Sequence, residues 1–575
     1  MKLRTDVGMT LNYILDASSD KFADRPAVGM AMETPITYAT MHHQVLLVAE
    51  RLLRDGVKKG DRVAILAENS DKWGIAYLSI VRIGAVAVPI LPDMPENDVR
   101  HILSEMRAKV LFTASRQLEK IEEARQPVAN KVVTLDDYKS AVDIMSIVPF
   151  ADYLREAEKL HTEEGPLDFP EVGEDDLAAI LYTSGTSGYS KAVMLTHKNF
   201  TANAYAASSL MKVSPEWTFL SILPLAHTYE FTCGFIVALL NGCRIAYAGK
   251  SPTPAILQNI CQHEKPEVVF AVPLVVEKVY KKRVLPSIEK SGVLQFLCRY
   301  RLTRAFLYRK IGARLLEFFG GNLQVMGIGG AAINPEVERF LAEARFPYLV
   351  GYGLTEAAPL LAGGPFGDHT IAVGSIGKPV PGVEVRIANA DPRTGIGEIE
   401  ATGPNIMRGY YGDQESTAKV LSPGGWLATG DLGCFDEAGN LYVKGRLKNV
   451  IVLSGGENVY IEPIEHKINA FPWVTESLVL ENAGKLEAWI HPDYEQIDEQ
   501  TAGQSASEQR QYIVKLMEQL RKTINEQLAP SSRLSRILER REPFVKTATH
   551  KIKRYLYDRN AAGLLATRQN GGELS

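Results

Sequence analysis

Hydrophobic and polar residues alternate along the first part of the chain in a pattern typical of strands and helices in turn. An apolar, strand-like run at 63–66 precedes a helical run at 73–83, and a second apolar run at 86–91 ends at Pro92. A strand, a helix and a strand within roughly 30 residues form a βαβ unit. The two strands of such a unit are parallel, so the pattern predicts a parallel sheet with helices on its faces.

The same alternation continues to residue 350. We expect further helices at 41–53, 95–106, 199–211 and 231–241. We expect further strands at 110–113, 179–182, 219–223, 244–247, 268–272, 323–327 and 348–350. The acidic and weakly periodic segment 136–176 is expected to form a helix and loops that pack outside the sheet.

From residue 374 the pattern changes to short β segments between Gly, Pro and Asp turns, which indicates a mainly antiparallel subdomain. Its strands are expected at 383–387, 397–402, 426–431 and 441–444. Beyond Arg446 we expect a small α+β unit with strands at 450–453, 477–481 and 485–490, helices at 462–470 and 511–528, and a linker at 496–508. The predicted fold class is therefore α/β, with a large N-terminal domain at 1–447 and a small C-terminal domain at 448–575.

Composition adds few constraints to this picture. A chain of 575 residues with 46% hydrophobic content is long enough for two or more domains with large cores. The net charge of −4 provides no general attraction to nucleic acid. The five cysteines show no CxxC spacing, which is typical of reduced thiols in a cytosolic protein without a structural metal. Without a signal peptide or a long apolar run, we expect a soluble, cytoplasmic protein.

The stretch 178–193 carries the clearest candidate chemistry. Its strand-like run leads into small hydroxyl and glycine residues and then a lysine: Thr183, Ser184, Gly185, Thr186, Ser187, Gly188 and Lys191. Glycines allow close approach of the backbone, successive N–H groups form an anion-binding concavity, and the lysine adds positive charge. The spacing differs from a Walker loop, in which lysine directly follows the last glycine. The alternative is a surface turn.

Three more segments that follow predicted strands have candidate roles. His227 lies in 223–230, where active-site loops of open α/β sheets occur, although a lone histidine is more often structural. The backbone at Gly330 and Ala331 can lie flat beside a planar ligand. The third segment combines an aromatic face, a glycine, a hydroxyl and a carboxylate that could stack a base, bind phosphate and hold Mg²⁺: Tyr352, Gly353, Thr355 and Glu356.

Two charged sites lie nearer the C-terminus. Asp431, at the end of a β run, is suited to accept hydrogen bonds from two ribose hydroxyls, and Arg446 could support the same sugar or a phosphate. Lys551 lies in the basic segment 546–554. That segment is either a solvated tail or the positive field that a lysine needs to neutralise a carboxylate and an α-phosphate together.

Residues 277–319 are unusually basic for their length. They carry Lys281, Lys282, Arg283, Arg299, Arg301, Arg304, Arg309, Lys310 and Arg314 among Leu, Phe and Tyr. A solvated helical face is one interpretation. Contact with an anionic membrane surface is the other.

Taken together, in this order and spacing, these motifs resemble the AMP-forming acyl-adenylate superfamily, which includes acyl-CoA synthetases, amino-acid adenylation domains and luciferases. The resemblance covers nearly the whole chain and rests on YTSGTSGYSKAVMLTH, LPLAHTYE, GIGGAAI, YGLTE, GSIGKPVPGVEV, GWLATGDLG, GRLKNVIVLSGGENVYIEPIE and TATHKIKR. Within the superfamily, GRLKNVIVLSGGENV, segment 271–280 and the basic insertion look most like long-chain fatty-acid CoA ligases.

The resemblance implies a role for each candidate residue in binding ATP. Thr183 to Gly188 with Lys191 would hold the β and γ phosphates. The adenine would be held by Tyr352, Gly330 and Ala331, the α-phosphate by Thr355, the ribose by Asp431 and Arg446, and Mg²⁺ by Glu356 and Thr183. Lys551 would stabilise charge as the acid's carboxylate attacks the α-phosphorus, which yields acyl-AMP and pyrophosphate.

The resemblance also implies a second half-reaction with CoA. The mobile C-terminal domain would pivot at Lys448, withdraw Lys551 and bring a loop to the CoA tunnel near His227: Ser454, Gly455 and Gly456. Two residues depart from the family pattern, because His550 replaces a glycine and Asn449 stands where an acid is common. These departures bear on the geometry of the second domain.

The expected partners are a fatty acid, ATP and CoA, with no nucleic acid, in the cytoplasm or peripherally at the inner face of the membrane through 277–319. Three alternatives remain open from the sequence. The acceptor could be an acyl carrier protein, or the acid could be an aryl acid. A nucleotide-binding regulator without turnover is the third, and the presence of Lys551 together with Glu356 and Asp431 argues against it.

Overall fold

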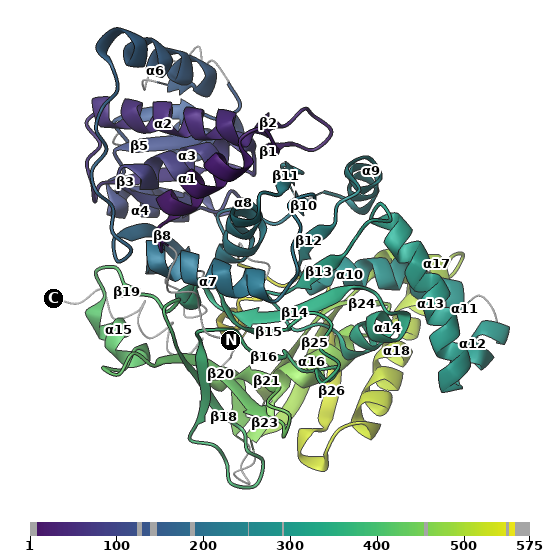
Figure 1. Ribbon diagram of the computed structural model, residues 1–575. Coiled ribbons are helices and arrows are strands. Elements are labelled where there is room, and N and C mark those ends of the chain that lie inside the picture. The colour runs from purple at the N-terminus through teal and green to yellow at the C-terminus, as the bar shows by residue number, and fades with distance from the viewer. Residues whose placement is uncertain are drawn as a thin grey trace.

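The computed structural model describes residues 8–122, 129–137, 147–183, 190–250, 252–289, 292–452, 458–482, 484–547 and 551–557. These residues form a mixed α/β molecule with two large sheets, a four-stranded antiparallel sheet and separate small sheets at the C-terminal end (Figure 1). The predicted α/β class is confirmed.

One large sheet has eight strands in the order β19-β9-β8-β4-β3-β5-β6-β7. Their bounds are β3 (Arg62–Leu66), β4 (Val86–Ile90), β5 (Val110–Thr113), β6 (Lys131–Thr134), β7 (Ile147–Pro149), β8 (Leu177–Thr183), β9 (Lys191–Thr196) and β19 (Gly409–Tyr410). β3 pairs in parallel with β4 and β5, which confirms the βαβ prediction. The expectation that 136–176 lies wholly outside the sheet is wrong, because β7 forms its edge strand.

The other large sheet has nine strands in the order β16-β15-β14-β13-β12-β10-β11-β1-β2. Their bounds are β1 (Pro26–Met30), β2 (Ile36–Thr37), β10 (Thr218–Ser221), β11 (Arg244–Tyr247), β12 (Val268–Ala271), β13 (Val325–Ile328), β14 (Tyr348–Gly353), β15 (Leu360–Gly363) and β16 (Lys378–Pro379). β14 is longer than predicted, because its end pairs with β15. Tyr352 therefore lies within a strand and not after one.

Helices of the N-terminal half bury their apolar sides in one core that includes residues of both large sheets. They are α1 (Leu11–Phe22), α2 (Tyr38–Arg54), α3 (Asp71–Arg82), α4 (Glu96–Met106), α5 (Glu119–Glu122), α6 (Phe150–Glu164), α7 (His197–Ser209) and α8 (Val237–Asn241). Ser70 begins α3 as its N-cap, and its hydroxyl accepts the N–H of Trp73. The helix predicted at 231–241 is confirmed, although its first part, Glu230–Ile236, is π-helical and only α8 is regular α-helix.

A second group of helices covers another core built on the nine-stranded sheet. They are α9 (Pro254–Glu264), α10 (Pro273–Val279), α11 (Leu285–Glu289), α12 (Gly292–Cys298), α13 (Arg301–Phe318) and α14 (Pro335–Ala344). Of these described helices, α12 contributes no buried residue to the core. Met326 of β13 and Phe340 and Leu341 of α14 are buried in this core. Of the helices in the described ranges, none is both long and apolar enough to cross a membrane.

The predicted antiparallel subdomain is confirmed as a sheet in the order β17-β18-β20-β21. Its strands are β17 (Glu384–Ala388), β18 (Gly397–Thr402), β20 (Leu427–Phe435) and β21 (Leu441–Arg446), and α15 (Gln414–Val420) lies between β19 and β20 in the chain. In β20 and β21 the register places Asp431 directly opposite Arg446.

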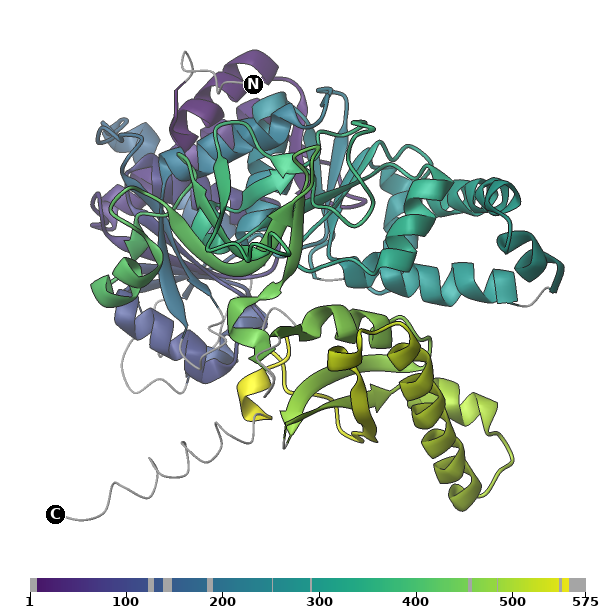
Figure 2. The ribbon, with the colours of Figure 1, turned by 90° about the horizontal axis from the view of Figure 1, so that it is seen from below.

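The C-terminal elements form a separate lobe with its own apolar core (Figure 2). They are β22 (Val450–Val452), β23 (Asn458–Tyr460), α16 (Ile461–Asn469), β24 (Val474–Asn482), β25 (Lys485–Pro492), α17 (Tyr494–Gln500), α18 (Ala506–Glu526) and β26 (Leu534–Glu539). The linker predicted at 496–508 is wrong. Asp493 caps α17, and a capping box of Ser505 and Glu508 begins α18 within that range. The domain boundary at 447/448 stays a prediction.

Candidate active site

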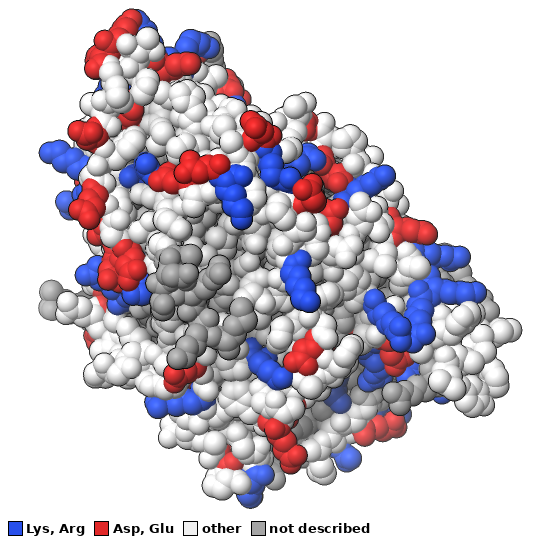
Figure 3. Space-filling view, in the orientation of Figure 1, with Lys and Arg blue, Asp and Glu red and all other residues white. Residues whose placement is uncertain are grey.

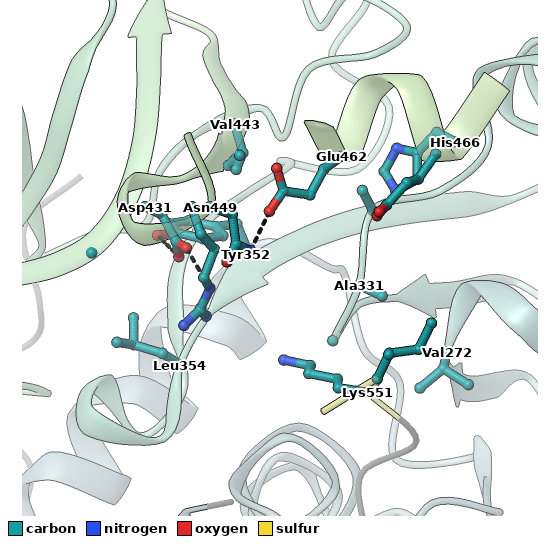
Figure 4. A pocket seen from close by; sticks show the side chains of 18 of the residues that line it. Val272, Ala331, Tyr352, Leu354, Asp431, Val443, Asn449, Glu462, His466 and Lys551 are labelled. Atoms are coloured by element: carbon teal, nitrogen blue, oxygen red, sulfur yellow. Dashed lines mark hydrogen bonds and ion pairs between the residues drawn. The ribbon is translucent and has the colours of Figure 1, made fainter. Parts of the chain in front are cut away.

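A cavity of about 2120 Å³ lies between the C-terminal lobe and the rest of the molecule. Its walls come from the β8–β9 hairpin, the loop after β10, the end of β14, β20 and β21, and the segment around Lys551. Figure 4 shows Lys551 and Ala331 around the same space as Tyr352 and Asp431. The cavity therefore brings together candidate residues that are up to 368 positions apart in the chain, from Thr183 to Lys551.

The glycine-rich stretch connects two antiparallel strands. β8 ends at Thr183 and β9 begins at Lys191, and these two residues are register partners. β9 was missed by the sequence analysis, which assigned Lys191 to the loop and began the next element at the helix. Ser184, Gly185, Thr186, Ser187 and Gly188 lie outside the described residues.

Tyr410 joins Lys191 to Glu356 and was not predicted as a site residue. The Lys191 ammonium lies 4.4 Å from the centroid of the Tyr410 ring, and the Tyr410 hydroxyl donates to Oε1 of Glu356 at 2.9 Å. Burial and the neighbouring carboxylate raise the pKa of Tyr410, so its hydroxyl remains a donor. The only sequence signal was an aromatic pair between glycines, at 409–412.

Asp431 is buried and shared between two side chains. Its Oδ1 lies 2.9 Å from Nε of Arg446, and its Oδ2 accepts the Tyr352 hydroxyl at 2.8 Å. Burial and Asp431 raise the pKa of Tyr352 well above its usual range. The phenol is thus held by its hydroxyl at the wall of the cavity.

Two glycines line the cavity at positions where the backbone requires glycine or favours it. A Cβ at Gly353 would lie 1.9 Å from the carbonyl oxygen of Pro359, so no other residue fits there. Gly330 has φ +82°, a conformation that favours glycine, and Ala331 follows it. Thr355 begins the 3-10 turn Thr355–Ala357 beside them.

Lys551 reaches the cavity from a C-terminal hairpin. The N–H of Thr547 donates to the Lys551 carbonyl at 2.8 Å, and Lys546 pairs with Ile552. The pKa of Lys551 is lowered by its enclosure in the cleft and by Arg446, and Asp431 and Glu356 partly oppose this shift. Lys551 therefore lies within electrostatic reach of three other candidate residues. His550 is outside the described residues.

Four cations, Lys191, Arg446, Lys448 and Lys551, converge on one region of the cavity. The pKa of Lys448 is lowered to about 8 by burial, by Arg446, and by Lys551 and Lys191, although Asp431 opposes the shift. Such crowding of like charge is unfavourable without a ligand. A polyanion would relieve it.

His227 lies in the cavity wall after β10. Its Nδ1 accepts the N–H of Tyr229 at 3.3 Å, and burial together with Lys551 lowers its pKa to about 4. The imidazole is therefore neutral at physiological pH. Nearby, burial raises the pKa of Glu230 to about 8.

The segment after Lys448 is described only in part. The side-chain amide of Asn449 donates to Oε1 of Glu462 at 2.6 Å, so the two residues connect the predicted hinge to α16 (Figure 4). Ser454, Gly455 and Gly456, between β22 and β23, lie outside the described residues.

Residues 15–411 match the family model described as AMP-binding enzyme. The chain belongs to the AMP-binding enzyme family. Its relatives in this family include long-chain-fatty-acid–CoA ligase FadD15 of Mycobacterium bovis, which is 30% identical over 78% of this chain and 76% of its own length. The medium-chain fatty-acid–CoA ligase of Escherichia coli is 27% identical over 77% of this chain and 73% of its own length.

Other members of the family are named for different acids. The 3-[(3aS,4S,7aS)-7a-methyl-1,5-dioxo-octahydro-1H-inden-4-yl]propanoyl:CoA ligase of Rhodococcus jostii is 28% identical over 83% of this chain and 86% of its own length. Among solved structures, the anthranilate CoA ligase AuaEII in complex with anthranoyl-AMP superposes with a TM-score of 0.79, at 22% identity, over 98% of this chain and 99% of that one. That likeness establishes the shared fold of the family.

Proposed function

We propose that this AMP-binding family member is an AMP-forming ligase that joins a fatty acid, with a long chain, to CoA. In the first half-reaction a carboxylate oxygen attacks the α-phosphorus of ATP, the bond to the β-phosphate breaks, and acyl-AMP and pyrophosphate form. In the second, the CoA thiol attacks the acyl carbonyl and AMP leaves. The observation that carries this proposal is the convergence of four cations with Glu356 and Asp431 in one cavity.

The proposed nucleotide site uses both faces of this cavity. The Tyr352 ring would stack on adenine beside Gly330 and Ala331. Asp431 would accept hydrogen bonds from the two ribose hydroxyls, since an ionised carboxylate has about four lone-pair sites and only two are used by Arg446 and Tyr352. Gly353 would keep this end of β14 close to the backbone of Pro359, beside the adenine.

The phosphates would lie toward the cations. Thr355 would contact the α-phosphate, and Lys191 with the loop 183–188 would hold the β and γ phosphates. The crowding of positive charge favours phosphate binding here. Its effect is already visible at Lys448, whose pKa is lowered by the neighbouring cations. A bound polyphosphate would raise that pKa again.

Glu356 and Thr183 would hold Mg²⁺. Among the described residues no three His, Cys, Asp or Glu side chains come together as a metal site. One carboxylate and one hydroxyl fit Mg²⁺, which commonly binds one or two carboxylates and takes its other oxygens from phosphates and water. When bound, the ion would neutralise charge on the phosphates. Tyr410 would orient Glu356 by its 2.9 Å hydrogen bond.

Lys551 would stabilise the negative charge that develops as carboxylate and α-phosphate meet. A pivot of the C-terminal domain at Lys448 would then remove Lys551 and bring Ser454, Gly455 and Gly456 toward CoA near His227. One movement would thus serve both half-reactions. Because Nδ1 of neutral His227 accepts the N–H of Tyr229, its Nε2 carries the proton and can donate a hydrogen bond toward the carbonyl.

An apolar part of the cavity supports a fatty acid as substrate. It is lined by Ile222, Leu223, Val272, Val275, Val279 and Ile333, and His227 lines the same cavity. Such a lining removes an alkyl chain from water without leaving polar groups unpaired. We also propose that the acid reaches the enzyme at the inner face of the membrane through the exposed part of 277–319.

A series of acids, assayed with ATP and with either CoA or an acyl carrier protein, tests the proposal. We expect AMP, pyrophosphate and acyl-CoA in equal amounts, with kcat/KM highest for long-chain acids such as palmitate. Highest activity with an aryl acid would contradict the proposed substrate. Highest activity with the carrier protein would contradict CoA as the acceptor. If no acid leads to pyrophosphate release, the proposed ligase activity is wrong and a nucleotide-binding regulator is the favoured alternative.

A further inference from the structure

The basic region 277–319 divides into two parts with different surroundings. In the first part, Val279, Tyr280 and Val284 are buried in the core on the nine-stranded sheet. Lys281 donates to the carbonyl oxygen of Asn469, at the end of α16 in the C-terminal lobe, at 2.6 Å. This part belongs to the interior and to the contact between lobes, so it cannot meet a large partner.

The second part, α12 and α13, exposes large apolar side chains. Leu302 is 85% exposed and Phe306 61% exposed, and three neighbours are also exposed: Val293, Phe296 and Tyr300. A groove of about 430 Å³ between the two helices is lined by Leu294, Leu297, Leu302, Thr303, Phe306 and Leu307, with Lys310 at its edge. Contiguous exposed apolar surface of this kind marks an interaction site more often than chance.

This surface is a built feature of the fold. The Thr303 hydroxyl bonds to the carbonyl oxygens of Leu297 and Tyr300 at 2.5 and 3.1 Å and so ties α12 to α13. Arg304 forms a bidentate pair with Glu343 of α14, with both distances 2.7 Å. The other end of α13 is anchored in the core. The apolar side chains are therefore held outward on a fixed hairpin.

The charges around the apolar surface are mostly positive. Residues 292–316 include six basic residues and no acidic one. Arg299, Arg309, Lys310 and Arg314 are exposed, and the Lys310 ammonium lies 4.8 Å from the centroid of the Phe306 ring. In Figure 3, Lys and Arg gather over α13 beside an uncharged projecting end of the molecule.

We infer that the α12–α13 hairpin, residues 292–318, docks on an anionic lipid bilayer. Phe296, Leu302 and Phe306 enter the headgroup region, and the flanking arginines and lysine bind lipid phosphates. This combination of aromatic and aliphatic side chains with six basic residues and a single acid, Glu317 near the end of α13, matches the chemistry of an anionic membrane surface. A basic apolar face is less suited to an uncharged protein partner.

The docked hairpin also lies close to the apolar part of the cavity. α13 packs against α9 and α14, and Leu257 of α9 and Leu274 and Lys278 of α10 line that cavity. Leu274 is itself exposed. An acid dissolved in the bilayer would therefore enter beside the docked face, a step that rests on the proposed function, whereas lipid binding itself does not.

Sedimentation of the full-length protein with vesicles tests the inference. The vesicles contain phosphatidylcholine alone or phosphatidylcholine with phosphatidylglycerol, at low and at high salt. We expect binding to the anionic vesicles that weakens at high salt. Two variants should each lower the partition coefficient about tenfold or more: Phe296→Ser/Leu302→Ser/Phe306→Ser and Arg309→Glu/Lys310→Glu.

Matched controls come from α18, which lies in the C-terminal lobe. Val514→Ser removes an exposed apolar side chain there, and Arg510→Glu/Lys515→Glu reverses two exposed charges; both should bind vesicles like the wild type. Equal loss in hairpin and α18 variants would overturn the inference, as would no salt-sensitive binding. Self-association that the hairpin variants abolish, without vesicle binding, would assign the surface to a second copy. Pyrophosphate release is measured on the same preparations. Release without vesicle binding would contradict the docking inference alone, whereas absence of release would contradict the proposed function.

Discussion

At Asp431 one carboxylate organises three elements. Its two oxygens engage Arg446 of β21 and Tyr352 of β14, and it lies on β20. Because the group is buried, each of these hydrogen bonds fixes the direction of the remaining lone pairs. A preorganised carboxylate binds a diol at lower entropic cost than a free one.

Tyr352→Phe should raise the KM for ATP about tenfold, because a hydrogen bond to a charged group contributes about 1.5–3 kcal/mol. The ring and its stacking face remain, so the KM for the acid should not change. Initial rates at varied ATP and varied acid measure both constants. Tyr442→Phe is the matched control, since it removes a hydroxyl that donates to Asp436 in the same sheet. If both variants raise the KM for ATP equally, the proposal that Asp431 binds the nucleotide is contradicted.

The pKa of Lys448, about 8, predicts a pH dependence. Below this value Lys448 is charged, and above it Lys448 loses its proton and attracts the phosphates less. We therefore expect kcat/KM for ATP to fall as pH rises through about 8. In Lys448→Gln this fall in kcat/KM above about pH 8 should be absent, and kcat/KM at lower pH should be smaller than in the wild type. If the fall in kcat/KM persists in Lys448→Gln, another group titrates and the prediction is contradicted.

At the scale of elements, Lys281 connects the turn after α10 to the end of α16. The carbonyl of Asn469 is one of the last in that helix, where a positive charge is favourable. Glu277 and Asp493 oppose the lowering of the Lys281 pKa that burial causes. The contact stabilises the present arrangement of the two lobes.

Lys281→Met should slow acyl-AMP formation about fivefold and leave thioester formation from supplied acyl-AMP unchanged or faster. The proposed pivot at Lys448 would separate Lys281 from Asn469, so the contact favours only the first half-reaction. Single-turnover assays of each half-reaction measure the two rates. Lys515→Met, on the exposed side of α18, is the control. A uniform decrease in both rates would show that Lys281 acts on stability alone.

Elements with strong local signals could be predicted from the sequence. The strands around the βαβ unit and the four strands of the antiparallel sheet lie within a few residues of their predicted ranges. β7 was missed because a strand of three residues is defined by its partner and not by its own pattern. β9 was missed because its first residue, Lys191, was assigned to the glycine-rich loop. The cap at Ser505 and Glu508 did carry a readable signal for α18.

The site shows the same division. Tyr352, Glu356, Asp431 and Arg446 were found because each lies in a motif, and the structure brings them to one cavity. Tyr410 was missed because its role depends on Lys191 and Glu356, which are more than 50 residues away in the chain. Charge convergence at Lys448 is likewise a property of tertiary structure, and no sequence pattern encodes its pKa.

At the scale of the whole molecule, the cavity is made by two lobes. The larger part of the chain contributes Lys191, Glu356 and Asp431, and the C-terminal hairpin contributes Lys551. In the proposed mechanism, this division makes adenylation depend on the position of the lobe and not only on residues in the larger part. We therefore expect Lys551 to act in the first half-reaction alone.

The most direct measurement compares both half-reactions in the wild type, in Lys551→Ala and in the control Lys553→Ala. Pyrophosphate release from ATP and palmitate reports the first, and palmitoyl-CoA formation from supplied palmitoyl-AMP and CoA reports the second. The account predicts that Lys551→Ala lowers the first rate by about 10²-fold or more and leaves the second within about twofold of the wild type. Undiminished pyrophosphate release, or equal loss of both rates in a folded protein, would contradict it.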